Sequence, residues 1–381
     1  MNKNFIKICV ICIIVFFAFK VYGSEKTTAS AIVDLRIMET TDLHGNIVDY
    51  DYIKNRKTVE LGLARTATLI KQARKEAANS LLFDDGDLLQ GNLLAEYVAL
   101  IDRFRTEPVH PMIRIMNLLQ YDAATFGNHD FHFGFDFLHR TIADAKFPFV
   151  NANMYYNDQQ PYNINELNMY KPYVILKKVV KDRSGKKHNL KVGVVGFVTP
   201  NVIQWEKKGL QGKAKVIDIV KSAEAYIPRM KEEGADIIIA LAHTGLNERA
   251  KSYENAEDAV YPLSLVPGID AILFGHRHKV FPDKSILKGV SGVDTSIGTI
   301  NGVPAVEAGS WGNYLGLIDL ILQKENGKWS IVHAKSKALP IFKIEKRKAK
   351  ALVKPDLQIL KAVKKIHDKT VQYSKRISKN K

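Results

Sequence analysis

Short apolar segments rich in β-branched residues recur along most of the chain, and each is bounded by glycine, aspartate or asparagine. Segments of this length and composition are typical of buried strands. The pattern predicts strands at Ala31–Met38, Ser80–Phe83, Ala123–Phe126, Phe147–Asn151, Leu190–Val198, Ile237–Ala242 and Ala271–Phe274.

Between these segments, apolar residues repeat with the spacing of an amphipathic helix. Strands that alternate with helices predict an α/β fold built in layers. The expected helices are Leu63–Ala78, Val109–Leu119, Phe135–Ala145, Val216–Glu233 and Asp258–Leu265.

The pattern changes after Asn301, where predicted strands follow one another without helices between them. The segments Pro304–Ala308, Tyr314–Gln323 and Trp329–Lys335 indicate a closing meander at the edge of the sheet. From Pro355 onward the spacing predicts one amphipathic helix, and no later segment is left to cover its apolar side.

The first residues have the organisation of a secretory signal peptide. Lys3 and Lys7 give a basic start, Ile8–Phe19 is an apolar run, and a small-residue cleavage site ends at Gly23. A membrane anchor is the alternative, but Lys20 ends the run well short of the roughly 20 residues that a span requires. The leader therefore predicts a periplasmic or secreted protein with no stable membrane span after cleavage.

Composition and charge refine this picture mainly at the two ends. Both cysteines, Cys9 and Cys12, lie in the leader, so the remaining chain has no thiol with which to form a disulfide. The net charge of +16 is concentrated in residues 341–381, which hold fourteen Lys or Arg against three acidic residues. A basic terminal segment favours a solvated helix or a disordered end over a nucleic-acid arm, so we expect no specific nucleic-acid partner.

Residues that commonly bind metals lie at, or just past, the C-terminal ends of the predicted strands. Open α/β sheets gather their ligands there, because the loops converge on one crevice. A single such residue says little, but the ordered set predicts two divalent metals that share a carboxylate, a site for phosphate-ester hydrolysis. The set is Asp42 and His44 in TTDLHGN, Asp87 in DDGDLLQGN, Asn128 and His129 in FGNHD, His243 in LAHTG, and His276 and His278 in FGHRH.

The residue types suit this chemistry. Asp42 and His44 are two residues apart, so in extended backbone they face the same side and can hold one cation together. The carboxylate of Asp87 can bridge two cations, and Asn128 offers a neutral oxygen. Imidazoles are favoured ligands of Zn, Mn, Co or Fe, although the sequence does not choose among these metals.

These residues and their surroundings resemble the metallophosphoesterase domain of the 5′-nucleotidase superfamily. The likeness runs from about Leu35 to Pro340, through LRIMETTDLHGN, GDLLQG, GNHDF, KFPFVNAN, LAHTGL, PGIDAILFGHRHKVFP and NGVPAVEAGSWGNYLGLIDL. Within the superfamily it is greatest to the bifunctional 2′,3′-cyclic-nucleotide 2′-phosphodiesterases/3′-nucleotidases. The second histidine of GHRH, where 5′-nucleotidases can carry glutamine, favours the same group.

The resemblance implies a four-layer αββα sandwich with two divalent metals at the sheet edge. A metal-activated water would open a 2′,3′-cyclic nucleotide to a 3′-nucleotide and would then release phosphate. His129 would face the substrate, where it stabilises charge or protonates the leaving oxygen. By position, one metal would be held by Asp42, His44 and His278, the other by Asn128, His243 and His276, with Asp87 as the bridge and with Gln90 and Gly91 supporting its loop.

The chain departs from the superfamily pattern in two places. In the 5′-nucleotidases an acid three residues after the catalytic histidine orients it, and here that position is His132, which leaves Asp130 as the candidate. Family members also continue into a C-terminal domain that stacks the nucleobase. Residues 1–23 are thus expected to form a leader, 24–340 the catalytic domain and 341–381 a linker helix and tail, without that domain. Tyr155, Tyr156 and Trp205 are expected to pack rather than to bind a base.

Other functions stay open at this point. The same catalyst could prefer 5′-nucleotides or UDP-sugars, or the chain could be a truncated, non-catalytic remnant that binds metal. A third alternative is a membrane-surface role for the basic tail. The expected partner is a small-molecule nucleotide, and the expected state is a monomer.

Overall fold

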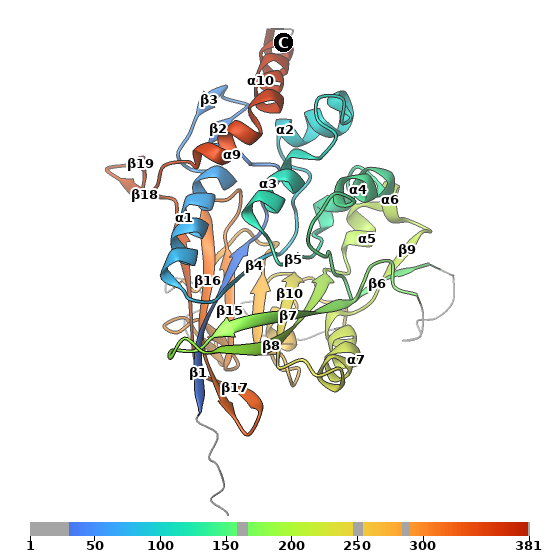
Figure 1. Cartoon of the computed structure of the whole chain (residues 1–381). Coiled ribbons are helices and arrows are strands. Elements are labelled where there is room, and N and C mark those ends of the chain that lie inside the picture. Colours follow the sequence, from blue (N-terminus) through green and yellow to red (C-terminus); the bar gives the residue numbers. More distant parts are fainter. Residues whose placement is uncertain (1–29, 158–166, 247–253, 284–289, 380–381) are drawn as a thin grey trace, which may run out of the picture.

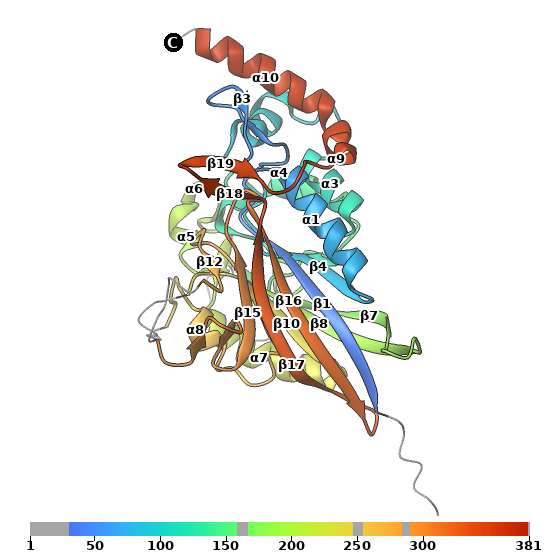
Figure 2. The same cartoon turned by 90° about the vertical axis from the view of Figure 1, so that its left-hand side faces the viewer.

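The computed structural model describes residues 30–157, 167–246, 254–283 and 290–379, so the predicted leader lies outside the described residues. Two β-sheets lie face to face, and helices cover the outer side of each (Figure 1 and Figure 2). This is the four-layer αββα sandwich that the resemblance implied. No helix among the described residues is both long enough and apolar enough to cross a bilayer.

The first sheet joins strands from both ends of the chain. Strand β1 pairs in parallel with β4 on one side and antiparallel with β16 on the other, and β16 continues into a hairpin with β17. In spatial order the strands are β17 (Lys328–Pro340), β16 (Tyr314–Glu325), β1 (Ala31–Thr40), β4 (Ser80–Asp84) and β5 (Ala123–Ala124).

The second sheet has a parallel centre formed by β8, β10, β11 and β15. Antiparallel strands close it on both sides, and β12 (Val280–Phe281) pairs with β15. In spatial order its strands are β13 (Val293–Asp294), β14 (Thr299–Ile300), β15 (Val303–Ala308), β11 (Ala271–Phe274), β10 (Ile237–His243), β8 (Lys187–Val198) and β7 (Tyr173–Lys181).

Helices and short hairpins complete the layers. The helices are α1 (Leu63–Glu76), α2 (Leu93–Glu96), the π-helix η1 (Tyr97–Asp102), α3 (Pro111–Leu119), the 3₁₀ turn η2 (Asn128–Phe131), α4 (Phe135–Ile142), α5 (Val202–Trp205), α6 (Lys207–Leu210), α7 (Ile219–Glu232), α8 (Val260–Leu263), α9 (Leu357–Ala362) and α10 (Lys364–Lys379). The hairpins pair β2 (Tyr50–Asp51) with β3 (Arg56–Lys57), β6 (Met154–Tyr156) with β9 (Ala214–Val216), and β18 (Phe342–Glu345) with β19 (Lys348–Ala351).

Strand β10 shows why the sequence folds into layers. Its residues are all buried, and successive side chains point to opposite faces of the sheet. Ile237, Ile239 and Leu241 therefore enter the core between the two sheets, whereas Ile238 and Ala240 pack towards the outer helices α7 and α8. A continuous apolar run is thus required, as in other strands that are covered on both faces.

One predicted strand and one predicted arrangement were wrong, and one strand was missed. Phe147–Asn151 forms only an isolated bridge between Phe149 and Ala124, because Pro148 has no N–H to donate to a ladder. The predicted meander is divided, since β15 belongs to the second sheet whereas β16 and β17 belong to the first. Edge strand β7 was missed, because lysines interrupt its apolar pattern.

The predicted C-terminal helix is two helices, α9 and α10, and it is docked rather than solvated along its apolar side. Ile359, Val363 and Ile366 are buried in the same core as α1 and α3. Asp356 caps α9 and forms an ion pair with Lys71 of α1 at 2.6 Å. Figure 2 shows both helices lying over the end of the molecule that carries the β2–β3 hairpin.

Acid is expected to destabilise the fold through His110, the N-cap residue of α3. Its Nδ1 accepts the Met112 N–H at 3.2 Å, and burial lowers its pKa to about 3. Below its ordinary pKa, 6.5, the unfolded chain takes up a proton here that the folded chain does not. The unfolding free energy should therefore fall by about 2 kcal/mol from this residue between neutral pH and pH 5.

Denaturant titrations at pH 7 and pH 5 check this. His110→Asn, which retains a good helix cap, should reduce the pH dependence by that amount. The exposed His333 of β17 provides the matched control, and His333→Asn should keep the wild-type dependence. An unchanged slope in His110→Asn would contradict the prediction.

Candidate metal centre

The predicted ligands meet at one end of the two sheets, on loops that follow parallel strands. Those of the first sheet follow β1, β4 and β5, and those of the second end β10 or follow β11. The loops are tied together by backbone hydrogen bonds, from Asp42 N–H to Gly86 O at 3.0 Å and from His44 N–H to Asp87 O at 2.8 Å. The His276 N–H donates to Asp42 Oδ2 at 3.0 Å, which joins the loops of the two sheets.

Most of these loops hold their ligand residue in an uncommon backbone conformation. Five of the seven candidate ligands have positive φ, namely Asp42, His44, Asp87, His276 and His278. For residues other than glycine this region costs roughly 1 kcal/mol or more each, and such strain gathers at functional sites. The strained backbone lowers the stability of the fold, and it directs these side chains towards one point.

The first group of side chains is the one that the resemblance placed together. Ligand atoms of Asp42, His44 and His278 lie within 4.8 Å of one another. His278 Nε2 is 3.2 Å from Asp42 Oδ1 and 3.0 Å from His44 Nε2. Two imidazole nitrogens and a carboxylate oxygen directed at one another form a typical set for a transition-metal cation.

A second group surrounds Asp87. Its carboxylate, Asp42 and His243 also lie within 4.8 Å of one another, and His243 Nε2 is 3.2 Å from Asp87 Oδ2. The same Oδ2 atom is 3.7 Å from His44 Nε2 of the first group. Asp87 thus stands between the two groups, as a bridging carboxylate would.

Several buried polar atoms in this site lack a hydrogen-bond partner in the described part of the chain and are of types that bind cations. Asp42 Oδ1, Asn128 Oδ1 and His243 Nε2 are buried, and no hydrogen bond with a described residue satisfies them. Burying such atoms unpaired costs free energy, so they normally have a partner. Their donor types, carboxylate, amide oxygen and imidazole, suit divalent metals and supply the expected partner.

Hydrogen bonds to the histidines select the nitrogen that would face a metal. His44 Nδ1 donates to Gln90 O and His243 Nδ1 donates to Asp85 O, both at 2.7 Å, which leaves each Nε2 free to coordinate. Gln90 thus orients His44 from the loop that carries Asp87. Gly91 leaves room for the same side chain, because a Cβ there would lie 2.8 Å from His44.

His276 is oriented in the opposite way. Its Nε2 lies 3.0 Å from Glu257 Oε1, so its Nδ1 is the nitrogen left for a ligand role. Its ring lies edge-on to His243, with the ring centroids 5.4 Å apart. Glu257 was missed from the sequence, because it lies in no motif and is 19 residues from His276.

Glu257→Gln is expected to weaken the binding of one metal about 10- to 100-fold, because the carboxylate orients His276 and increases its basicity. Chelator competition with metal analysis measures this directly. Asp258→Asn is the matched control, since Asp258 pairs with Arg277 and not with a candidate ligand. Equal losses of affinity in the two variants would show that Glu257 acts only through the local fold.

The site is strongly electrostatic. Burial opposes charge on every group, but the mutual attraction of acids and imidazoles outweighs it, lowering the pKa of Asp42 and Asp87 and raising the pKa of His44 to about 9. Other buried carboxyls surround the site, where burial and neighbouring acids raise the pKa of Glu39 and Asp85. Such a concentration of acidic groups attracts cations.

Asp130 has a different place from the one expected of it. Its carboxylate accepts backbone N–H groups of Gly127, Asp87, Leu88 and Leu89 at 2.8–3.0 Å, and so ties the Asp87 loop to η2. His129 Nδ1 has no hydrogen-bond partner among the described residues. In this structure Asp130 ties loops together, and its carboxylate makes no hydrogen bond to the His129 ring.

His129 lies beside the ligand groups without joining either of them. Its ring is edge-on to the ring of His44, with the ring centroids 5.2 Å apart. Its backbone N–H donates to Asp87 Oδ1 at 2.7 Å. His132, at the position where 5′-nucleotidases have an acid, has its Nδ1 3.3 Å from Glu206 Oε2. Trp205, expected to pack, is 43% exposed and stacks on His276.

The fold and the site together define a metal-dependent phosphoesterase domain. Residues 35–280 match the family of calcineurin-like phosphoesterases, and the chain belongs to this family.

Its similarity to known members is extensive. The chain is 45% identical over 354 residues to the 2′,3′-cyclic-nucleotide 2′-phosphodiesterase/3′-nucleotidase of Salmonella typhimurium, covering 92% of this chain and 53% of that protein. It is 47% identical over 312 residues to the trifunctional nucleotide phosphoesterase protein YfkN of Bacillus subtilis, covering 81% and 21%. The chain thus spans about half the length of the Salmonella protein.

Solved structures agree with the fold. The crystal structure of the calcineurin-like phosphoesterase YfkN from Bacillus subtilis superposes with a TM-score of 0.82 at 43% identity, covering 90% of this chain and 99% of that one. The 5′-nucleotidase precursor of Thermus thermophilus shares the fold at 22% identity, with a TM-score of 0.62 over 89% and 59%.

Proposed function

We propose that this chain hydrolyses 2′,3′-cyclic nucleotides to 3′-nucleotides, and 3′-nucleotides to nucleosides and phosphate, with two divalent metals. The observation that carries the proposal is the placement of Asp87, whose Oδ2 faces His44 in one ligand group and His243 in the other. The relatives named for this activity, at 43–45% identity, support the choice of substrate.

The proposed ligands are those of the sequence assignment: Asp42, His44 and His278 for one metal, Asn128, His243 and His276 for the other, and Asp87 for both. Bound there, the metals would activate a water near neutral pH and neutralise phosphoryl oxygens. The donor types favour ions of the Zn, Mn, Co and Fe class.

The chain's own residues prepare the reaction. Asp87 Oδ1 holds the backbone of His129, which fixes the imidazole beside the ligand groups. His129 would donate a proton or hydrogen bond to O2′ as the P–O2′ bond breaks, leaving the 3′-phosphate. In the second round the P–O3′ bond breaks, and the same imidazole would donate a proton or hydrogen bond to O3′. The predicted leader would deliver the protein to the periplasm or the exterior, where we propose that it acts as a monomer.

Turnover of adenosine 2′,3′-cyclic phosphate, 3′-AMP and 5′-AMP, together with metal analysis, tests the proposal. We expect two metals per chain and faster hydrolysis of the first two substrates. Faster hydrolysis of 5′-AMP would favour the 5′-nucleotidase alternative. Two metals without turnover of any substrate would favour the non-catalytic alternative.

A further inference from the structure

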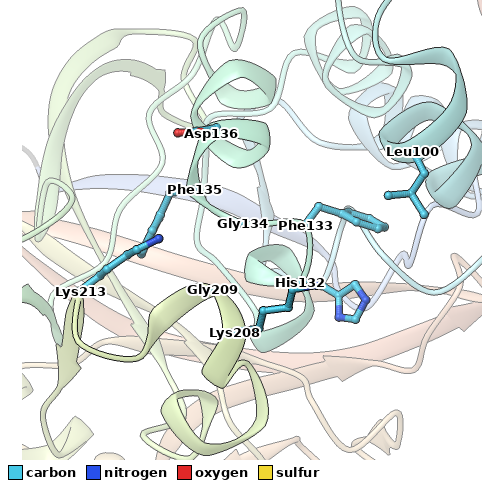
Figure 3. A pocket seen from close by; sticks show the side chains of 9 residues that line it. All are labelled: Leu100, His132, Phe133, Gly134, Phe135, Asp136, Lys208, Gly209 and Lys213. Atoms are coloured by element: carbon cyan, nitrogen blue, oxygen red, sulfur yellow. The ribbon is translucent and has the colours of Figure 1, made fainter.

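A cavity of about 410 Å³ lies between the segment that leads into α4 and the segment around α6 (Figure 3). Small-molecule sites begin at about 300 Å³, so a nucleoside is of suitable size. The walls that matter here are Leu100 of η1, His132 and Phe133 before α4, and Lys208 and Lys213 in and after α6.

The cavity is connected to the candidate metal centre through His132, which lines it. His132 directly follows η2 and donates its N–H to His129 O at 3.2 Å. A 3₁₀ turn rises about 2 Å per residue, so three residues separate His132 from His129 by about 6 Å. Glu206, which precedes α6, lies 3.3 Å from the His132 ring, and its neighbour Trp205 stacks on His276 with centroids 5.4 Å apart.

The walls combine apolar surface with positive charge. Leu100 is 53% exposed, and the Phe133 ring is held edge-on by Phe137 at a centroid distance of 5.3 Å. Lys208 and Lys213 form no ion pair with any residue that the structure describes. In Figure 3 the side chain of Asp136 points away from His132 and Phe133.

We propose that this cavity is a nucleoside subsite in which the base packs on Phe133 and Leu100. Lys208 and Lys213 hold the 5′-phosphate of substrates that carry one. The inference rests on the proposed function and names its substrate class: cyclic nucleotides with a second phosphate at O5′ are preferred over those without it. A base packed on an aromatic ring improves binding about tenfold or more, so the domain itself distinguishes nucleotides from simple phosphate esters.

The test of the base contact compares adenosine 2′,3′-cyclic phosphate with glycerol 1,2-cyclic phosphate, which has the same cyclic ester and no base. Phe133→Leu keeps the apolar contact with Phe137 and removes the ring face. We expect kcat/KM for the adenosine substrate to fall about tenfold, while that for the glycerol substrate is unchanged. Leu100→Ala, at an exposed position, should act in the same direction and replaces Phe133→Leu if that variant fails to fold.

The test of the charge adds a 5′-phosphate to the adenosine substrate. This should lower KM in the wild type, and the double variant Lys208→Ala/Lys213→Ala should remove the gain. Lys207→Ala is the matched control, since Lys207 is an exposed lysine of α6 that does not line the cavity. If the double variant instead raised KM equally for the substrates with and without the 5′-phosphate, this part of the proposal would be overturned.

Failure of the subsite and failure of the proposed function give different results. Equal losses for the adenosine and glycerol substrates would overturn the subsite while the activity stands. If the wild type hydrolyses neither, the proposed activity fails, and calorimetry with adenosine 5′-phosphate still decides the subsite. Binding weakened by Phe133→Leu and by the lysine variant, but not by Lys207→Ala, would support it, and unchanged binding would overturn it.

Discussion

Asp87→Asn is expected to lower turnover of adenosine 2′,3′-cyclic phosphate by about 10³-fold or more and to release bound metal. Oδ2 of Asp87 lies 3.7 Å from His44 Nε2 and 3.2 Å from His243 Nε2. Asparagine keeps the shape of the side chain but loses one oxygen ligand and the negative charge. If the amide nitrogen takes the place of Oδ1, the hydrogen bond from the His129 backbone N–H is also lost.

The matched control is Asp122→Asn, at the opposite end of the same sheet. Asp122 also accepts a backbone N–H, from Leu82 at 2.8 Å, but it has no contact with the ligand groups. Turnover and metal content measured by mass spectrometry separate the two variants. A form of Asp87→Asn with two metals and wild-type turnover would show that the bridge is wrongly assigned.

Much of the fold was predictable because burial dictates residue type. A strand covered on both faces must be apolar at every position, as β10 is, so its sequence was recognisable. The ligand residues were predictable because the chemistry requires particular atoms at the C-terminal ends of strands. Their order along the chain therefore predicted the candidate site before any distance was known.

The division of β15 and β16 between two sheets was not predictable from local pattern. Both segments are apolar, and only long-range pairing assigns one to β11 and the other to β1. The loop that crosses between the sheets contains Trp311, whose N–H donates to Asp42 O at 2.7 Å. The crossing therefore helps to build the metal centre, which the sequence did not indicate.

Supporting residues were missed for the same reason. Glu257 and Glu206 act on His276 and His132 from segments without a motif, so only the folded chain brings them together. The cavity at Phe133 is likewise a product of segments that are about 75 residues apart. The sequence did not indicate this cavity, in which we propose that the base packs.

His129→Ala is expected to reduce turnover about 10²- to 10⁴-fold, the usual contribution of general acid catalysis, without releasing metal. The ring lies beside the ligand groups but belongs to neither of them. Thermal stability should be close to that of the wild type, because the imidazole Nδ1 satisfies no described partner. Turnover, metal content and thermal unfolding are measured on the same preparation.

Asp130→Asn should show the opposite combination, and the comparison decides what Asp130 does. Its two oxygens accept four backbone N–H groups, and an asparagine directs its own NH₂ at some of these donors. Each buried amide left unpaired costs about 1–3 kcal/mol, so the loops that carry Asp87 and Asn128 should loosen. We expect lower thermal stability and weaker metal binding, with most of the turnover restored by excess metal. If Asp130→Asn instead keeps its metal and stability and loses turnover as His129→Ala does, then Asp130 acts through the imidazole after all.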